Sequence, residues 1–460
     1  MLNLHDTARG LVRPLELREP GKVSMYVCGP TVYDLPHLGH GRFTLVFDVL
    51  RRYLVFSGLD VTYVSNITDI DDNIIAKANR EGRTEAEVSA EFEERWWEAM
   101  DALGVLRPDH IPHATGYVDG MIETIAALLE VGVAYVTDDG VYLDTSTVPD
   151  YGLLAGQPLD SLRSGARIEE DAAKRSPLDF ALWKAAKPDE PAWDAPFGAG
   201  RPGWHTECVV MSLALLGEGF DLHGGGLDLK FPHHENERAQ SVALGRPFAR
   251  HWAHNGWVMV DGEKMSKSLN NFTSLTDLLD KADGRAYRLL VLRSHYRVPV
   301  EVTADTIADA ERGLARLDTF ARRFGLRSPA GPVRLDDGHE ADLEAVARFV
   351  AFMDDDLQTP QALGLVFELV GEANAAMDAG DEDRARVVAS TVVLLTAAMG
   401  LTLDGTQREI DDDTAALVAE RDLARATKDF ARSDALRDEL VERGWLVEDT
   451  PEGTVLHRKD

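Results

Sequence analysis

The chain has 460 residues, 44% of them hydrophobic, so it can bury sizeable cores and divide into three or four structural units. No segment approaches the roughly 18 uninterrupted apolar residues that a membrane span requires, and we expect a cytoplasmic protein without a membrane partner. The net charge of −31 argues against a nucleic-acid partner, because phosphate binding depends on lysine and arginine.

Two arginine-rich clusters could still bind nucleic acid, because a negative net charge does not rule out a local basic face. They are Arg312, Arg316, Arg322, Arg323 and Arg327, and, at helical spacing, Arg421, Arg425, Lys428, Arg432 and Arg437. Solvated helix faces balanced by neighbouring acids are the alternative explanation. Charge alone therefore leaves the partner undecided.

A parallel crossover unit is predicted near the N-terminus. Apolar residues alternate over 23–27 and again over 61–67, which predicts two strands, and residues 41–56 carry apolar residues at helical spacing before Gly58. Ligands on parallel sheets bind outside the carboxyl ends of the strands. The loop CGPTVYDLPHLGHG would lie at that position.

The rest of the chain predicts an insertion, a helical region and a terminal module. Turns and a Pro/Trp-rich stretch interrupt the pattern from about residue 110 to 200, as expected of an insertion into the sheet domain. Long helical patterns then run from about 310 to 400. An acidic, turn-rich stretch leads to a last helix and two short segments.

Two loops carry residues suited to phosphate chemistry. Residues 37–40, HLGH, place two imidazoles three positions apart around a glycine, beside the start of the predicted helix, where a phosphate can bind. Residues 264–268, KMSKS, follow an Asp-Gly turn and offer two ammonium and two hydroxyl groups to a polyphosphate. Each loop alone also fits an ordinary polar surface loop, but the two together are far more specific.

A possible metal site is the third feature. The only cysteines, Cys28 and Cys208, favour a metal or catalytic role over a disulfide in a cytosolic chain. His233 and Glu237 share one face if a helix begins there, and thiolate, imidazole and carboxylate are all zinc ligands. Spacing alone does not separate this set from buried structural cysteines.

With these features in order, the sequence resembles the bacterial cysteinyl-tRNA synthetase family of class I. HLGH corresponds to the HIGH signature of that class, and KMSKS matches letter for letter. The resemblance covers nearly the whole chain, through YVCGPTVYD, NITDIDDNII, RPGWHTEC, FDLHGGGLDLKFPHHENE, HNGWVMVDGEKMSKS, DDDLQTP and KDFARSDALRDEL. One departure is Asn270, where the family pattern has glycine.

The resemblance implies a role for each site residue. One zinc ion per chain would be held by Cys28, Cys208, His233 and Glu237. The thiolate of L-cysteine would bind that zinc in a pocket lined by Thr68, Trp204, His223 and Asp228. ATP with Mg²⁺ would bind at His37, Gly39, His40, Lys264, Ser266, Lys267 and Ser268. The catalytic residues among these would be His37, His40, Lys264 and Lys267.

Zinc ligation would explain selection of cysteine without editing. Zinc prefers a soft thiolate to the hard, poorly ionised hydroxyl of serine, which has a similar size. A hydrophobic pocket separates such analogues only about 10- to 200-fold, whereas an obligatory ligand excludes them far more strongly.

The resemblance also implies the fold class and the reaction. We expect an α/β protein whose class I Rossmann-like parallel-sheet catalytic domain carries an insertion and precedes a helical bundle and a small anticodon-binding domain. The expected divisions are 1–110 and 201–255 for the catalytic halves, 111–200 for the insertion, 256–310 for the KMSKS and stem-contact region, 311–400 for the bundle and 401–460 for the anticodon-binding domain. The chain would form cysteinyl-adenylate and transfer cysteine to the terminal adenosine of tRNA(Cys), as a monomer.

Two other functions remain open at this stage. A related ligase passes cysteine from the same adenylate to an amino sugar, as in mycothiol synthesis, but that family resembles the catalytic half only. A non-catalytic RNA-binding paralogue need not keep both signature histidines and both lysines, which are all present here.

Overall fold

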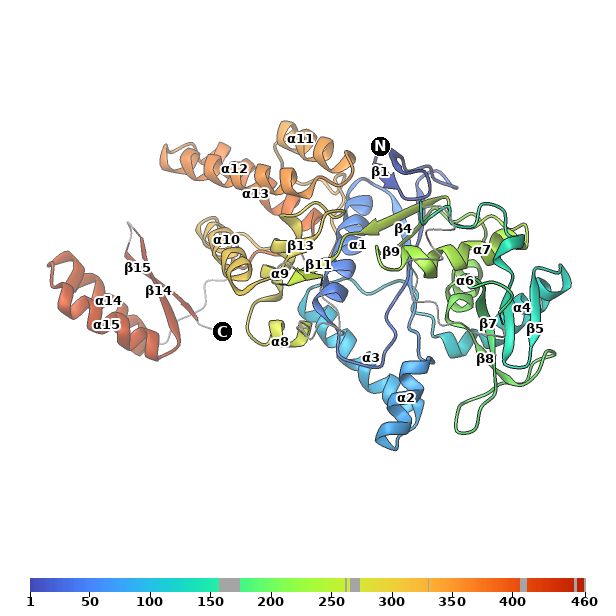
Figure 1. The fold of residues 1–460 in the computed structure, drawn as a ribbon. Helices are drawn as coiled ribbons and strands as arrows, with labels where there is room; N and C mark the ends of the chain where they lie inside the picture. The colour runs from blue at the N-terminus through green and yellow to red at the C-terminus, as the bar shows by residue number, and fades with distance from the viewer. Residues whose placement is uncertain are drawn as a thin grey trace. The chain divides into compact units, whose positions relative to one another are not determined.

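The computed structural model describes residues 1–156, 174–260, 263–264, 274–329, 331–405, 412–450 and 453–458. The chain divides into two compact units, Met1–Asp404 and Gly405–Asp460 (Figure 1). None of the helices in the described ranges has the length and apolar character needed to cross a membrane.

A parallel sheet of four strands, in the order β10-β9-β3-β4, lies at the centre of the first unit. Its strands are β3 (Lys22–Val27), β4 (Asp60–Ser65), β9 (Leu222–Gly226) and β10 (His251–Asn255). Helix α1 (Leu38–Phe56) connects β3 to β4 and confirms the predicted crossover unit. The carboxyl ends of β3, β9 and β10 meet at one edge, so the loops that follow them share a site.

The predicted insertion forms an antiparallel sheet in the order β5-β6-β7-β8, beside α4 (Figure 1). Its elements are α4 (Val118–Glu130), β5 (Ala134–Thr137), β6 (Gly140–Leu143), β7 (Phe180–Ala185) and β8 (Gly200–Pro202). Two helices precede it, α2 (Asp72–Glu81) and α3 (Glu85–Ala102). The chain then returns to the central sheet through α6 (Trp204–Leu216), β9, the π-helical turn η3 (Lys230–His234), α7 (Glu235–Ala243) and β10.

Helices dominate the rest of the first unit, as the periodicity predicts. After the short strands β11 (Val258–Val260) and β12 (Glu263–Lys264) come α8 (Leu275–Leu279), α9 (Gly284–Leu292) and β13 (Val300–Glu301). The helical region holds α10 (Ala304–Arg323), α11 (Leu343–Asp354), α12 (Thr359–Asp378) and α13 (Glu382–Ala398). At the N-terminus, β1 (Asn3–Asp6) and β2 (Leu11–Pro14) form a hairpin.

The second unit pairs two helices with a β-hairpin, where the sequence suggested one helix and two short segments. Its elements are α14 (Asp412–Ala426), α15 (Phe430–Glu442), β14 (Trp445–Thr450) and β15 (Gly453–Arg458). Arg421 does not belong to the basic face considered from the sequence, because it is 2% exposed and donates to Asp449 at 2.7 Å. Lys428 and Arg437 are exposed.

A buried ion cluster joins α1 to α9 and to the end of the helical region. The carboxylate of Asp48 accepts from Arg288 at 2.6 Å, from Arg52 at 2.9 Å and from the backbone N–H of Leu106 at 2.9 Å. Gly400, with φ +70°, lies so close that a Cβ atom would come within 2.4 Å of Arg288. The cluster therefore fixes the helical region against the sheet domain.

We predict that Asp48→Asn lowers the free energy of unfolding by about 3–5 kcal/mol, because it leaves two buried guanidinium groups without their carboxylate. Burial raises the pKa of Asp48, but Arg288 and Arg52 outweigh it and hold that pKa below its usual value. The stabilisation is therefore present above about pH 4 and lost as pH falls through the folded-state pKa.

Denaturant unfolding of both proteins between pH 3 and pH 7 measures this difference. Asp60→Asn is the matched control, because Asp60 is 72% exposed in its pair with Arg334 and should change stability by less than about 1 kcal/mol. Equal effects of the two substitutions at pH 7 would contradict the role given to the cluster.

Candidate active site

Cys28 is the first residue after β3, at the carboxyl edge of the sheet. Its backbone N–H donates to the carbonyl of Gly224 in β9 at 3.3 Å, which continues the parallel pairing of the two strands. The next residue, Gly29, has no room for a side chain, because a Cβ atom would lie 1.7 Å from the carbonyl oxygen of Asn66. The thiol is thus held where the loops after β3, β4 and β9 converge.

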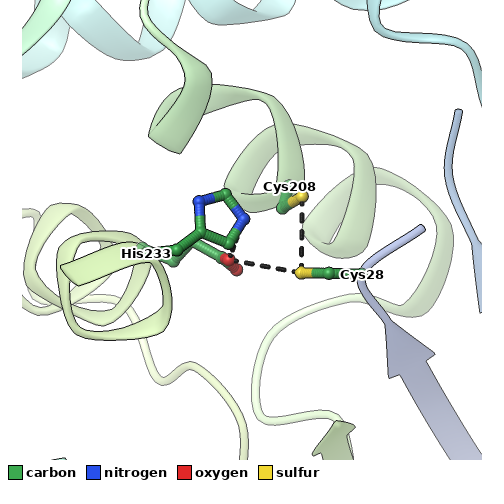
Figure 2. A group of neighbouring side chains, drawn as sticks. Cys28, Cys208 and His233 are labelled. Atoms are coloured by element: carbon green, nitrogen blue, oxygen red, sulfur yellow. Dashed lines mark hydrogen bonds and ion pairs between the residues drawn. The ribbon is translucent and has the colours of Figure 1, made fainter. Parts of the chain in front are cut away.

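Three other side chains reach the same point from α6, η3 and α7. The Sγ atoms of Cys28 and Cys208 lie 3.6 Å apart, and the Sγ atom of Cys28 lies 3.4 Å from Oε1 of Glu237. Nε2 of His233 lies 2.9 Å from the same carboxylate oxygen. Figure 2 shows the three labelled side chains pointing toward one another. All four residues are buried, and their ligand atoms lie within 4.8 Å of one another.

These separations fit a tetrahedral metal ion. Zinc–sulfur bonds are about 2.3 Å long, so two thiolates at tetrahedral angles lie about 3.8 Å apart, close to the observed 3.6 Å. Nε2 of His233 makes no hydrogen bond of acceptable geometry although Glu237 lies 2.9 Å away, as expected for two ligands directed at one ion.

The electrostatics of the group favour a cation. Burial and the neighbouring Cys208 raise the pKa of the Cys28 thiol well above its usual value, whereas a hydrogen bond with Cys28 lowers the pKa of Cys208 to about 6 against the effect of burial. Burial and mutual repulsion therefore oppose the ionisation of both thiols at once. Glu237 raises the pKa of His233 to about 10 despite burial. A divalent ion would allow both thiolates to form and would displace the proton from His233.

A second set of potential ligands overlaps the first. Cys28 and Glu237 also lie within 4.8 Å of His223 and His234. However, His223 Nε2 hydrogen-bonds Glu237 Oε2 at 2.7 Å, and His234 Nδ1 hydrogen-bonds His254 at 2.8 Å. We favour the set that uses both thiols, in which His223 orients the ligand carboxylate from outside.

A cavity of about 500 Å³ opens over the buried group. Cys28 lies at its wall, and Trp204 and Asp228 line it as the resemblance implies. The ring of Trp204 stacks on that of His233 with centroids 4.0 Å apart. Thr68 and His223 are buried and do not line this cavity, so their predicted contact with a substrate stays a prediction.

The HLGH segment also lines the cavity, through His37, Gly39 and His40. His37 is the N-cap of α1, and His37 and His40 each accept the other's backbone N–H at 3.2 Å, with their rings stacked 3.6 Å apart. The N-terminus of α1 therefore faces the cavity beside Gly39 and two imidazoles, an arrangement that suits an anion.

The KMSKS segment is described only in part. The backbone of Lys264 belongs to β12, where it pairs with Met259 of β11. The predicted residues Ser266, Lys267 and Ser268, together with Asn270, lie outside the described residues.

Sequence reasoning missed a buried polar network behind the thiols. Oδ1 of Asn66 accepts from the backbone N–H of Gly29 at 2.9 Å and from the hydroxyl of Tyr26 at 3.1 Å. Nδ2 of Asn66 donates to Thr68, whose hydroxyl donates to Glu207 at 2.8 Å. The NITDIDDNII segment contains Asn66 and Thr68, but a linear motif does not show which of its side chains point inward.

Comparisons with known proteins agree with this geometry. Residues 14–312 match the model of the class I (C) tRNA synthetase catalytic domain, and residues 348–404 match that of the DALR domain. A solved Mycobacterium tuberculosis methionyl-tRNA synthetase bearing methionyl-adenylate has a TM-score of 0.59 over 82% of this chain and 90% of its own. At 15% identity it shows the shared fold alone.

Two relatives that align over their full length have the same name. The cysteine–tRNA ligase of Alkalilimnicola ehrlichii is 48% identical to this chain over 471 residues, and that of Halorhodospira halophila is 46% identical over 468 residues. Each alignment covers 100% of both chains. The buried thiol–imidazole–carboxylate group, the HLGH wall above it and these full-length similarities agree that the chain belongs to the cysteine–tRNA ligase family of class I tRNA synthetases.

Proposed function

We propose that the chain is a cysteine–tRNA ligase, which activates L-cysteine with ATP to cysteinyl-adenylate and transfers cysteine to the 3′-terminal adenosine of tRNA(Cys). One observation carries the proposal: two thiols, an imidazole and a carboxylate converge beside a cavity that is lined both by Cys28 and by the HLGH helix start. The cavity would thus bring a metal that binds the substrate thiolate close to a helix start that binds phosphate.

The buried group would hold one zinc ion through Cys28, Cys208, His233 and Glu237. When bound, zinc supplies a Lewis-acidic site that accepts the thiolate of cysteine in preference to the hydroxyl of serine. His223 holds Glu237 in place by a 2.7 Å hydrogen bond. Trp204 and Asp228 would border the substrate, with Thr68 behind them.

The HLGH and KMSKS segments would bind ATP with Mg²⁺. His37, Gly39 and His40 present ring nitrogens and the helix N-terminus to the phosphates, so that the cysteine carboxylate can approach the α-phosphorus. Lys264 and Lys267, with Ser266 and Ser268, would neutralise the charge that develops on the departing pyrophosphate.

The second unit would contribute to tRNA binding. Arg425, Lys428, Arg432 and Arg437 would supply the phosphate contacts, although Arg425 also pairs with Asp449 and Arg432 with Glu420. Arg421 is buried and donates to Asp449. We also propose that the protein acts as a cytoplasmic monomer, with the domain divisions given above.

Cysteine-dependent exchange of pyrophosphate into ATP tests the activation step. The purified chain should catalyse exchange with L-cysteine and not with L-serine, and it should then aminoacylate tRNA(Cys) but not an amino sugar. Exchange followed by transfer only to the amino sugar would favour the mycothiol-type reaction. No exchange from a folded, metal-replete protein would favour a non-catalytic RNA-binding role.

We predict that Cys208→Ser weakens metal retention and cysteine activation together, because a hydroxyl replaces one of two thiolate ligands. Metal analysis after dialysis against a chelator should fall from one zinc per chain to a small fraction, with exchange reduced at least about 100-fold. Ser212→Ala, one turn further along α6 and equally buried, is the matched control and should retain the metal. Full activity in a metal-free Cys208→Ser protein would contradict the proposed site.

We predict that removing residues 405–460 spares pyrophosphate exchange, because all proposed catalytic and metal residues lie in the first unit. The tRNA concentration needed for aminoacylation should rise. The slope of log affinity against log salt concentration should become less steep by about 0.7–0.9 for each lost phosphate contact. Filter binding at several salt concentrations measures the slope. Equal loss of both reactions in a folded truncation would show that this unit supports the active site instead.

A further inference from the structure

Arg42 is a buried cation whose charge is not paired. It lies on α1 two residues after His40 and is 1% exposed. In the part of the chain that the structure describes, no carboxylate forms an ion pair with it, and burial lowers its pKa to about 10. Burying an unpaired guanidinium group costs free energy unless hydrogen bonds satisfy its N–H groups.

The partners of Arg42 are three backbone carbonyl groups from two segments. Nη1 donates to the carbonyl of Trp257, and Nη2 donates to those of Val298 and, at 3.3 Å, Tyr296. Trp257 lines the cavity and immediately precedes β11, which pairs in parallel with β13. Arg42 thus binds the start of both strands to the helix that carries the two signature histidines.

Strand β11 links this contact to Lys264. Met259 of β11 pairs with Lys264 of β12, so the backbone of the first signature lysine is attached to the strand that begins directly after Trp257. The carbonyl of Trp257 also accepts from the backbone N–H of Val300 at 3.0 Å. One carbonyl group therefore joins α1, β11 and β13.

The chain returns from the KMSKS segment to the same helix start. The backbone N–H of Leu275 donates to the carbonyl of Pro36 at 2.9 Å, and the backbone of Ser274 forms an isolated antiparallel β-bridge with that of His37. The chain on both sides of residues 265–273 is therefore attached near the HLGH segment. The side before 265 is bound through Arg42, and the side after 273 is bound through Pro36 and His37.

We infer that Arg42 is a positioning residue for adenylate formation, which holds the β11–β12 hairpin at a fixed distance from His37 and His40. The inference rests on the function proposed above. Arginine suits the position because its rigid fork reaches carbonyls of two segments at once, whereas a lysine ammonium is a single compact donor group. A displacement of about 1 Å between the two halves of an active site can cost a factor of 100 in rate.

Arg42→Lys tests the inference, with Arg51→Lys as the matched control. Arg51 lies on the same helix and donates to Arg107 and Asp109 instead. In the zinc-loaded full-length protein, Arg42→Lys should lower the kcat of cysteine-dependent exchange about 10- to 100-fold, with a smaller change in KM for ATP and unchanged zinc content. Arg51→Lys should leave kcat within about twofold.

A double-mutant cycle with Lys264→Ala separates positioning from general stability. If Arg42 acts through the hairpin, Lys264→Ala should cost less in the Arg42→Lys background than in the wild type. Additive effects, or a kcat equal to that of Arg51→Lys, would overturn the inference. Wild-type protein without cysteine-dependent exchange would instead contradict the proposed function.

Gly256→Ala provides a second variant if Arg42→Lys does not fold. A Cβ atom at residue 256 would lie 2.7 Å from the carbonyl oxygens of Arg297 and Val298, so it would displace the junction that Arg42 binds. It should lower kcat similarly and, combined with Lys264→Ala, should also be non-additive. A folded Gly256→Ala protein with wild-type kcat would count against the inference.

Discussion

The parallel pairing of β9 with β3 is the constraint on which the rest of the site depends. Met25, Tyr26 and Val27 of β3 align with residues 222–224 of β9, although these strands lie nearly 200 positions apart in the chain. Gly224 permits this packing, because a Cβ atom there would lie 2.3 Å from the ring of Phe47 on α1. The register brings Cys28 next to His233 on η3 and Glu237 on α7. It also sets the start of α1, with His37 and His40, at the same edge of the sheet.

Burial then determines the chemistry of the thiols. Two cysteines and a carboxylate buried together repel one another when ionised, and this repulsion together with burial raises the pKa of Cys28 well above its usual value. The surrounding residues hold the geometry: His223 hydrogen-bonds Glu237, His205 contacts His233 at 3.0 Å, and Asn66 accepts from the backbone of Gly29. A site built in this way would hold its ligands in place before a metal ion binds, which would favour the ion with the matching geometry.

The acidic composition and a tRNA substrate are compatible because the charges are distributed unevenly. Many arginines are occupied within the fold: Arg52 and Arg288 hold Asp48, Arg42 holds backbone carbonyls, and Arg421 holds Asp449. These side chains stabilise packing and contribute little to the surface field. Phosphate recognition would then depend on where the exposed cations lie on the surface, which the net charge does not describe.

The sequence by itself determined the fold class, the crossover unit, the family and the four candidate ligands, because these depend on local periodicity and on motifs that keep their spacing along the chain. Only the tertiary structure decided which side chains face the cavity. It placed Thr68 and His223 behind the cavity wall, buried Arg421 against Asp449, and revealed Asn66 and Arg42 as partners of backbone groups. These outcomes depend on strand register and helix packing between distant segments, and no local pattern encodes the direction in which a side chain meets a remote group.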